Sequence, residues 1–201
     1  MNRLIALTAG FAILAAMPHD AHTQVKKYDV KSGIITFQVD LEMGSLKVTN
    51  KIMVYFDDYG VKECHENYNG DILKSWLFSD GQMQYAVSPG KKTAEKRGKA
   101  YARGTEYRFD WNEIPESDRT SGKAKRLPNV TVAGKNCESY MVGSSTDRTI
   151  YAGWSHVCLM IDVSTPSMKS LIKAVKFEEQ VKVPPEKFAV PAGYQVKESS
   201  M

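Results

Sequence analysis

The alternation of apolar and polar side chains between residues 35 and 43 is the feature that most restricts how this chain folds. The apolar positions are Ile35, Phe37, Val39, Leu41 and Met43, and polar residues fill the positions between them. A repeat of two residues, with β-branched and aromatic side chains on the apolar side, is typical of a half-buried β-strand. The alternation resumes at 46–56, where only Asn50 interrupts the apolar side. These two segments predict a pair of antiparallel strands.

Turn-forming residues separate the strand-like segments. Residues 57–60 (Asp-Asp-Tyr-Gly) and 79–81 (Ser-Asp-Gly) combine early Asp with late Gly, as tight turns favour. Further strand-like segments lie at 61–68, 72–78, 83–87, 130–132, 137–142, 149–154 and 157–163. Turn signals about every eight to twelve residues are typical of a large antiparallel sheet that is curved or partly closed. The expected fold class is therefore mainly β, an α+β arrangement with a few short helices.

Three segments depart from this pattern. Residues 89–103 are basic and poor in large apolar side chains, which predicts a connection or an exposed edge. Residues 111–129 are the weakest strand candidate and the best place for a short helix, with Asn112 or Ser117 as its N-cap. In 167–178 the apolar residues recur at helical spacing, so periodicity by itself predicts a helix there.

The first 23 residues have the features of a secretory signal peptide. Arg3 gives a basic start, residues 4–17 are almost wholly apolar, and Ala21-His22-Thr23 places small residues before a cut at Gln24. An apolar run of about 14 residues is shorter than the roughly 20 that a membrane-spanning helix needs. We therefore expect no transmembrane segment, and export to the periplasm or beyond after cleavage near Gln24.

The mature chain, residues 24–201, has the length of one ordinary domain, and export places it where disulfides form. It has three cysteines, so at most one internal disulfide leaves one free thiol. We favour a Cys137–Cys158 disulfide, since both lie in strand-like segments close along the chain; three buried apolar thiols are the alternative. The first cysteine is Cys64, so no thiol near the cleavage site carries a lipid anchor.

The charged residues point to no polyanionic partner. Lys and Arg number 27 and Asp and Glu 23, a net charge of +4 that is spread over both signs, so we do not expect nucleic acid binding. Two alternatives remain for the basic segment 89–103: peripheral contact with a membrane surface, or a loop that is only solvated. With only His65 and His156 in the mature chain and no cysteine pair at ligand spacing, we expect no metal and no cofactor.

Two cysteine–histidine neighbours are the candidates for catalysis. Cys64 and His65 are adjacent, so on an extended strand their side chains point to opposite faces. His156 and Cys158 share a face, but the sequence identifies no third group that orients the imidazole. We therefore interpret His156 as structural and Cys158 as buried or bridged, and we expect no enzyme activity.

Three segments together resemble a known family: residues 54–60 (Val-Tyr-Phe-Asp-Asp-Tyr-Gly), 132–140 (Val-Ala-Gly-Lys-Asn-Cys-Glu-Ser-Tyr) and 188–194 (Phe-Ala-Val-Pro-Ala-Gly-Tyr). In this order they resemble exported bacterial proteins, common in Bacteroidetes, that are known only as a domain of unknown function. That family is similar to periplasmic lipoprotein carriers and insertion proteins of the LolA and LolB type. The resemblance implies an unclosed half-barrel of antiparallel strands around a few helices. It also implies that 167–178 is a strand, and it brings no catalytic residue.

The implied half-barrel has a hydrophobic cavity on its concave side. The side chains expected to line it are Ile35, Phe37, Val39, Val48, Ile52, Val54, Phe56 and Trp76. At about 0.8 kcal/mol per buried methylene, a partly enclosed acyl chain would bind with micromolar affinity. We expect a monomeric, non-catalytic carrier or chaperone for a hydrophobic ligand, lipid or lipoprotein. The alternative is an envelope interaction or structural module whose concave face is only packed core.

Overall fold

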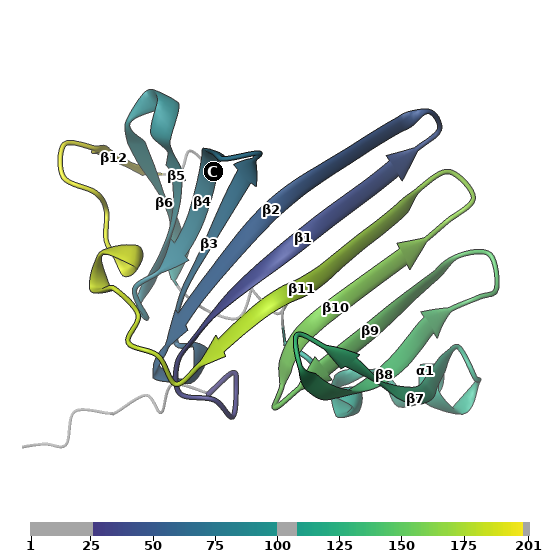
Figure 1. Cartoon of the computed structure of the whole chain (residues 1–201). Coiled ribbons are helices and arrows are strands. Elements are labelled where there is room, and N and C mark those ends of the chain that lie inside the picture. Colours follow the sequence, from purple (N-terminus) through teal and green to yellow (C-terminus); the bar gives the residue numbers. More distant parts are fainter. Residues whose placement is uncertain (1–25, 100–107, 199–201) are drawn as a thin grey trace, which may run out of the picture.

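A computed structural model describes residues 26–99 and 108–198. Within these residues every strand belongs to one twelve-stranded sheet, in the order β12-β6-β5-β4-β3-β2-β1-β11-β10-β9-β8-β7 (Figure 1). The expected signal peptide, residues 1–23, lies outside the described residues. No helix in the described part of the chain combines the length and apolar character needed to cross a bilayer.

The elements have the following bounds. The first half supplies β1 (Gly33–Met43), β2 (Leu46–Asp57), β3 (Lys62–Asn69), β4 (Ile72–Ser79), β5 (Met83–Ser88) and β6 (Thr93–Lys99). The second half supplies β7 (Ala124–Val132), β8 (Lys135–Gly143), β9 (Arg148–Trp154), β10 (Val157–Ser164), β11 (Lys169–Glu179) and β12 (Gln195–Glu198). The short helices are η1 (Asp58–Gly60), η2 (Pro89–Lys91), η4 (Trp111–Glu113), α1 (Glu116–Thr120) and η5 (Pro185–Phe188).

The sheet consists of two antiparallel meanders joined at β1 and β11. Strands β1 to β6 pair in sequence order, β7 to β11 do the same, and β11 then pairs with β1. The exception to the antiparallel pattern is β12, which lies parallel to β6. Because β12 and β7 are both edges, the sheet does not close. The expected open, curved antiparallel sheet is confirmed.

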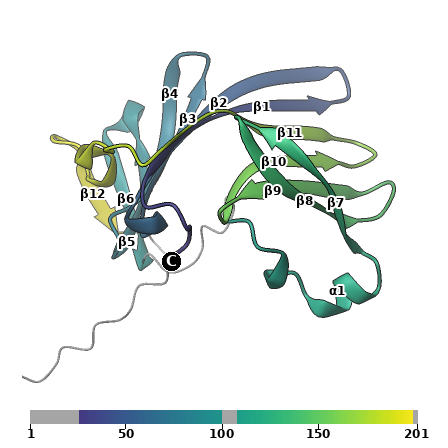
Figure 2. The ribbon, with the colours of Figure 1, turned by 60° about the horizontal axis from the view of Figure 1, so that its bottom comes forward.

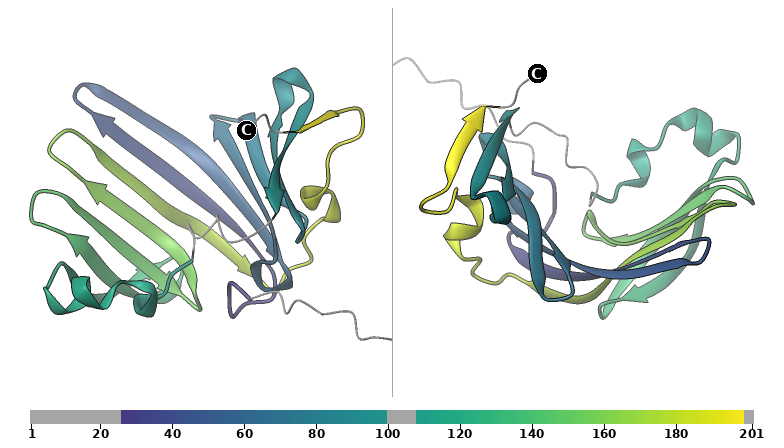
Figure 3. Two further views of the ribbon diagram at one scale, coloured as in Figure 1. Left: turned by 180° about the vertical axis from the view of Figure 1, so that it is seen from behind. Right: turned by 90° about the horizontal axis from the view of Figure 1, so that it is seen from above.

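The curvature of the sheet makes a trough. Figure 2 shows the strands arching, with α1 on the hollow side of β7, β8 and β9. The view from above in Figure 3 shows the same trough open on one side, with η5 and the approach to β12 on its outer side. The few helices therefore leave much of the concave face of the sheet without a helical layer.

The helical spacing in 167–178 has a structural cause. The segment is β11, as the resemblance implied, and its ladder with β1 shifts register so that Ala174 pairs with Phe37 and Lys176 with Thr36. The extra residue, Val175, belongs to a β-bulge and is 58% exposed. One inserted residue breaks the two-residue repeat, and the broken repeat resembles helical periodicity.

Two other segments contain more strand than expected. The short helices η4 and α1 lie in 111–129 as predicted, but β7 begins at Ala124 instead of Val130. The basic segment 89–103 contains β6, which lies next to the edge strand β12. Pairing with a neighbouring strand satisfies the backbone groups of both segments even though their side chains are mostly polar.

The N-terminal segment before β1 is anchored on the sheet by a buried carboxylate. Lys27 Nζ lies 2.7 Å from an Oε atom of Glu63, and the Tyr28 hydroxyl donates a hydrogen bond to the other. Burial alone raises the pKa of the Glu63 carboxyl, but Lys27 and His65 outweigh it and lower that pKa to about 2. The Tyr28 ring also packs edge-on against Phe56 at 4.8 Å.

The C-terminal segment is anchored in the same way on the convex side. Glu66, which is 5% exposed, accepts hydrogen bonds from Lys187 at 2.5 Å and from the Tyr68 hydroxyl at 2.7 Å. The Lys187 ammonium also lies over the Tyr55 ring. Phe188 completes the packing, since it joins a convex core cluster that includes Tyr55.

Candidate functional site

Apolar side chains from five strands form one row across the concave face. Each member of the row pairs with the next one on the neighbouring strand, in the order Val39, Ile172, Ile161, Tyr151 and Tyr140. Tyr140 is covered by Phe109 and Trp111, which precede α1, whereas the other four side chains are only half-buried. The row therefore offers an apolar surface that the described residues leave partly open.

The open surface extends along the β1–β2 hairpin. Leu41 pairs with Val48 beside the row, and both side chains are half-buried. Exposure rises toward the turn, where Met43 and Leu46 are 48% and 53% exposed. At the other end of the hairpin, Phe56 is fully buried beneath Tyr28.

Seven of the eight predicted lining residues share the concave face. The register pairs Ile35 with Val54, Phe37 with Ile52 and Leu41 with Val48, and it places Phe56 opposite Gly33. Within this set the buried core members are Ile35, Phe37, Val54 and Phe56. Val39, Val48 and Ile52 are half-buried and remain accessible to a ligand, so their binding role stays a prediction.

The predicted place of Trp76 is wrong. Trp76 pairs with Glu66, which pairs with Met53, and Met53 lies between the concave-facing residues of β2. Side chains alternate between faces along a strand, so Trp76 belongs to the convex face. There it packs against Tyr194 at 6.0 Å, in the cluster formed with the C-terminal segment.

Asn50 is a polar group within the open apolar surface. It pairs with Val39 at the end of the apolar row, and its amide oxygen is buried without a hydrogen-bond partner among the described residues. A buried acceptor without a donor costs about 1–3 kcal/mol. The unpaired oxygen of Asn50 is therefore expected to lower the stability of the sheet at this point.

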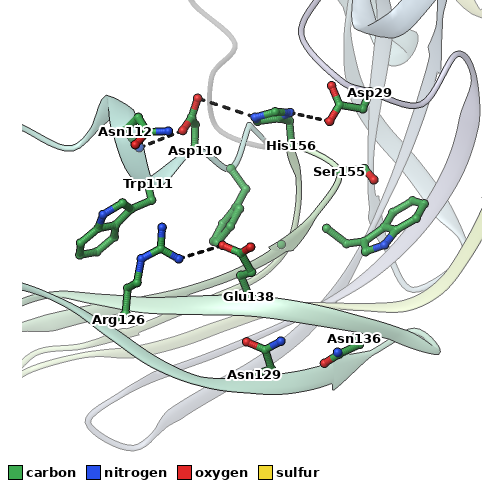
Figure 4. Close-up of a pocket in the computed structure, with 13 residues that line it drawn as sticks. Asp29, Asp110, Trp111, Asn112, Arg126, Asn129, Asn136, Glu138, Ser155 and His156 are labelled. Atoms are coloured by element: carbon green, nitrogen blue, oxygen red, sulfur yellow. Dashed lines mark hydrogen bonds and ion pairs between the residues drawn. The ribbon is translucent and has the colours of Figure 1, made fainter.

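A polar pocket of about 540 Å³ lies on the same side of the sheet, over β7, β8 and β9. Figure 4 shows Asp110, His156 and Asp29 in a line along one side, with Asn129 and Asn136 on the other. His156 Nδ1 lies 2.9 Å from Asp29 Oδ2, and its Nε2 lies 3.8 Å from Asp110 Oδ2. The imidazole is thus held between two carboxylates.

The turn that carries His156 has an unusual backbone. Ser155 and His156 join β9 to β10 with φ angles of 49° and 62°, as in a two-residue hairpin turn of the type that usually contains Gly or Asn. Two outside segments dock on it: the amide of Asp29 donates to Ser155 O and that of Phe109 to His156 O. The docking needs Gly153, because a Cβ there would lie 2.3 Å from the Phe109 ring.

The structure does not pair His156 with Cys158 for catalysis. Cys158 is 1% exposed, and its thiol donates to the carbonyl oxygens of Met160 and Ala152. Burial raises the pKa of this thiol to about 12, so it remains protonated at neutral pH. The carboxylate beside the histidine, Asp29, was not found from the sequence because it lies 127 residues away.

All three cysteines are free, buried thiols in this structure. The favoured disulfide between Cys137 and Cys158 is therefore not formed in it, and the pairing stays a prediction. Burial also raises the pKa of Cys64 to about 12. The described part of the chain has no group of three or more His, Cys, Asp or Glu side chains that could hold a metal ion.

A second pocket, of about 380 Å³, lies on the convex side. Trp76 and Cys64 line it together with residues 189–192 of the C-terminal segment. Glu66 also lines this pocket, but Lys187 and Tyr68 already occupy its carboxylate oxygens. The pocket is a gap beside a packed anchor, and the concave face remains the better candidate site.

Comparisons by sequence give no relatives. No family model matches the chain, and the search of curated proteins finds no match either. The resemblance to a family of exported bacterial proteins therefore stays a prediction.

Comparisons by structure do find similar proteins. An uncharacterised conserved protein from Thermus thermophilus matches with a TM-score of 0.57 at 9% identity, over 88% of this chain and 95% of that one. MucB matches with a TM-score of 0.52 at 12% identity, over 85% of this chain and 61% of MucB. In the Pseudomonas aeruginosa MucA/MucB complex the match has a TM-score of 0.51 at 14% identity, over 83% of this chain and 58% of that one.

This chain thus spans about three fifths of the length of MucB. A LolA superfamily protein from Nitrosomonas europaea is also among the matches, with 6% identity and a TM-score of 0.39, over 82% of this chain and 92% of that one. Identities this low show a shared fold alone. The chain therefore has an open, curved β-sheet fold like that of the Thermus thermophilus protein and MucB.

Proposed function

We propose that this protein is a non-catalytic binding protein of the periplasm that holds the acyl chain of a lipid or lipoprotein in its trough. The observation that supports the proposal is the apolar row through Val39, Ile172 and Ile161, which is only half-buried because no helix among the described residues covers it. Apolar side chains that line an open concavity are typical of sites for hydrophobic ligands.

The row has a suitable length for an acyl chain. Tyr140 is covered, so the open part of the row crosses the four strands that carry Val39, Ile172, Ile161 and Tyr151. Neighbouring strands lie about 4.8 Å apart, so this part extends for about 14 Å. Micromolar affinity corresponds to about 8 kcal/mol, which is the transfer free energy of about ten methylene groups at 0.8 kcal/mol each. A long-chain acyl group that is partly covered would reach this number.

The second candidate function is the binding of a protein segment. The similar protein MucB has been solved in complex with MucA, and an open trough with an apolar floor also suits an extended or helical segment of a partner. Binding of a protein segment would use the same face of the sheet but requires no acyl chain. The two candidate functions differ in the ligand expected to copurify with the protein.

Binding of an acyl-chain probe tests the proposal. We expect the purified mature protein, residues 24–201, to bind 11-(dansylamino)undecanoic acid as a monomer with a micromolar Kd, measured by dansyl fluorescence. Native mass spectrometry of protein isolated from its own envelope should show a bound lipid or acylated peptide. An empty protein that ignores the probe contradicts the proposal, and recovery of an unacylated partner protein favours the second candidate.

Replacing Asn50 by valine is expected to stabilise the protein. The change removes a buried amide oxygen without a partner and adds a β-branched side chain to a strand, so the free energy of unfolding should rise by about 1 kcal/mol in urea denaturation. Asn69→Val, at the exposed end of β3, is the matched control and should change it by less than about 0.5 kcal/mol. A loss of stability in Asn50→Val would mean that the amide oxygen is satisfied in solution.

A further inference from the structure

The polar pocket over β7, β8 and β9 takes no part in acyl-chain binding as proposed above. It lies on the concave side but is lined by amide, carboxylate, guanidinium and indole groups. Its volume of about 540 Å³ falls within the usual range of small-molecule sites, about 300–1,000 Å³. We propose that this pocket is a second binding site, and that its ligand is an uncharged saccharide.

The floor of the pocket presents hydrogen-bonding groups that the described protein leaves unused. Asn129 on β7 and Asn136 on β8 line the pocket from exposed positions at its base (Figure 4), and neither side-chain amide has a hydrogen-bond partner among the described residues. Each amide offers two donors and an acceptor. A sugar hydroxyl is both donor and acceptor, so it matches these groups better than a purely donating or accepting ligand does.

Two tryptophans give the pocket apolar surface between these polar groups. Trp111 and Trp154 line it, and each indole is held from one face by a cation. Arg126 lies over Trp111 at 4.9 Å from the ring centroid, and Lys135 lies over Trp154 at 4.3 Å. Held aromatic rings beside fixed polar groups suit a ligand with both C–H and hydroxyl faces, as a pyranose has.

The opposite side of the pocket is fixed by the carboxylate-flanked histidine. Asp29 and Asp110 hold the His156 imidazole from both sides and so fix the direction of the ring. The carboxylates also supply acceptors for sugar hydroxyls.

The charges in the pocket select against acidic sugars. Among the residues that line the pocket, the carboxylates of Asp29, Asp110 and Glu138 outnumber the one guanidinium, that of Arg126, which lies 3.0 Å from Glu138. The cations just outside the lining are paired with further carboxylates, Arg108 with Glu113 as well as Asp110, and Lys135 with Glu179. Even with His156 protonated, the lining remains negative. A uronic acid would therefore meet repulsion in a partly desolvated site, whereas an uncharged sugar would not.

Tryptophan fluorescence provides a direct test, because two of the three tryptophans of the chain line this pocket. The mature protein is titrated with chitobiose, cellobiose and maltose as uncharged probes, with digalacturonic acid as the acidic probe, and with spermidine as an amine without hydroxyls. We expect at least one uncharged disaccharide to bind and digalacturonic acid to bind at least tenfold more weakly. Asn129→Ala and Asn136→Ala should each weaken the disaccharide at least tenfold.

The controls separate this site from the acyl-chain site. Asn69→Ala, an exposed asparagine at the β3–β4 hairpin, should leave disaccharide binding unchanged. Both pocket variants should bind 11-(dansylamino)undecanoic acid as the parent protein does. Failure of the saccharide proposal can therefore be distinguished from failure of the acyl-chain proposal. Binding of spermidine alone, binding of no disaccharide, or binding that both pocket variants retain in full would overturn the saccharide site.

Discussion

Replacing Glu63 by alanine is expected to lower the free energy of unfolding by about 3–5 kcal/mol. The carboxylate is buried and binds the Lys27 ammonium at 2.7 Å and the Tyr28 hydroxyl, so its removal leaves the cation buried without a counter-charge and the hydroxyl without its acceptor. It also releases the segment that covers Phe56. Urea denaturation followed by circular dichroism measures the loss.

The pH dependence identifies the carboxylate as the cause. The pKa of Glu63 is about 2 in the folded protein and ordinarily 4.5, so its contribution is fully present above pH 4.5 and disappears as the pH falls toward 2. The stability difference between the parent protein and Glu63→Ala should therefore narrow over that interval. Glu178→Ala, which removes an exposed partner of Lys176, should cost less than about 1 kcal/mol. An unchanged difference down to pH 2 would contradict this account of the anchor.

Replacing Val39 by aspartate is expected to abolish binding of the acyl-chain probe. Val39 lies within the apolar row, next to Ile172, and an acyl chain that covers the row would have to desolvate the new carboxylate. Burying an unpaired charge costs several kcal/mol, which exceeds the binding free energy contributed by the few methylenes of the acyl chain that lie over this position. We expect the Kd for 11-(dansylamino)undecanoic acid to rise at least a hundredfold in the fluorescence titration.

Two further variants keep this result interpretable. Val196→Asp makes the same chemical change on the exposed strand β12, where the parent side chain is 55% exposed, and should leave the Kd unchanged. Val39→Thr keeps the shape of the side chain but adds a hydroxyl, so it should weaken binding by a smaller factor. It tests the role of the row even if the aspartate variant disturbs the strand. Probe binding by correctly folded Val39→Asp at the parent affinity would show that the row is not the site.

The local sequence already determined the strands and their faces. The two-residue repeat in 35–56 fixed which side chains of β1 and β2 lie together, because alternation along a strand is a property of the extended backbone itself. The turn residues at 57–60 and 79–81 indicated where one strand ends and the next begins. That part of the prediction required no knowledge of distant contacts.

Tertiary structure decided what local pattern does not encode. Trp76 lies on the convex face because the β3–β4 register, and not its own size or polarity, sets the direction of its side chain. A single β-bulge at Val175 interrupts the two-residue repeat of β11, so its apolar residues recur at helical spacing. The pocket around His156 depends on Asp29 and Phe109 docking on one turn from remote segments. Alternation is local, whereas register, bulges and docking depend on strand pairing and packing between residues far apart in the chain, so only the folded structure reveals them.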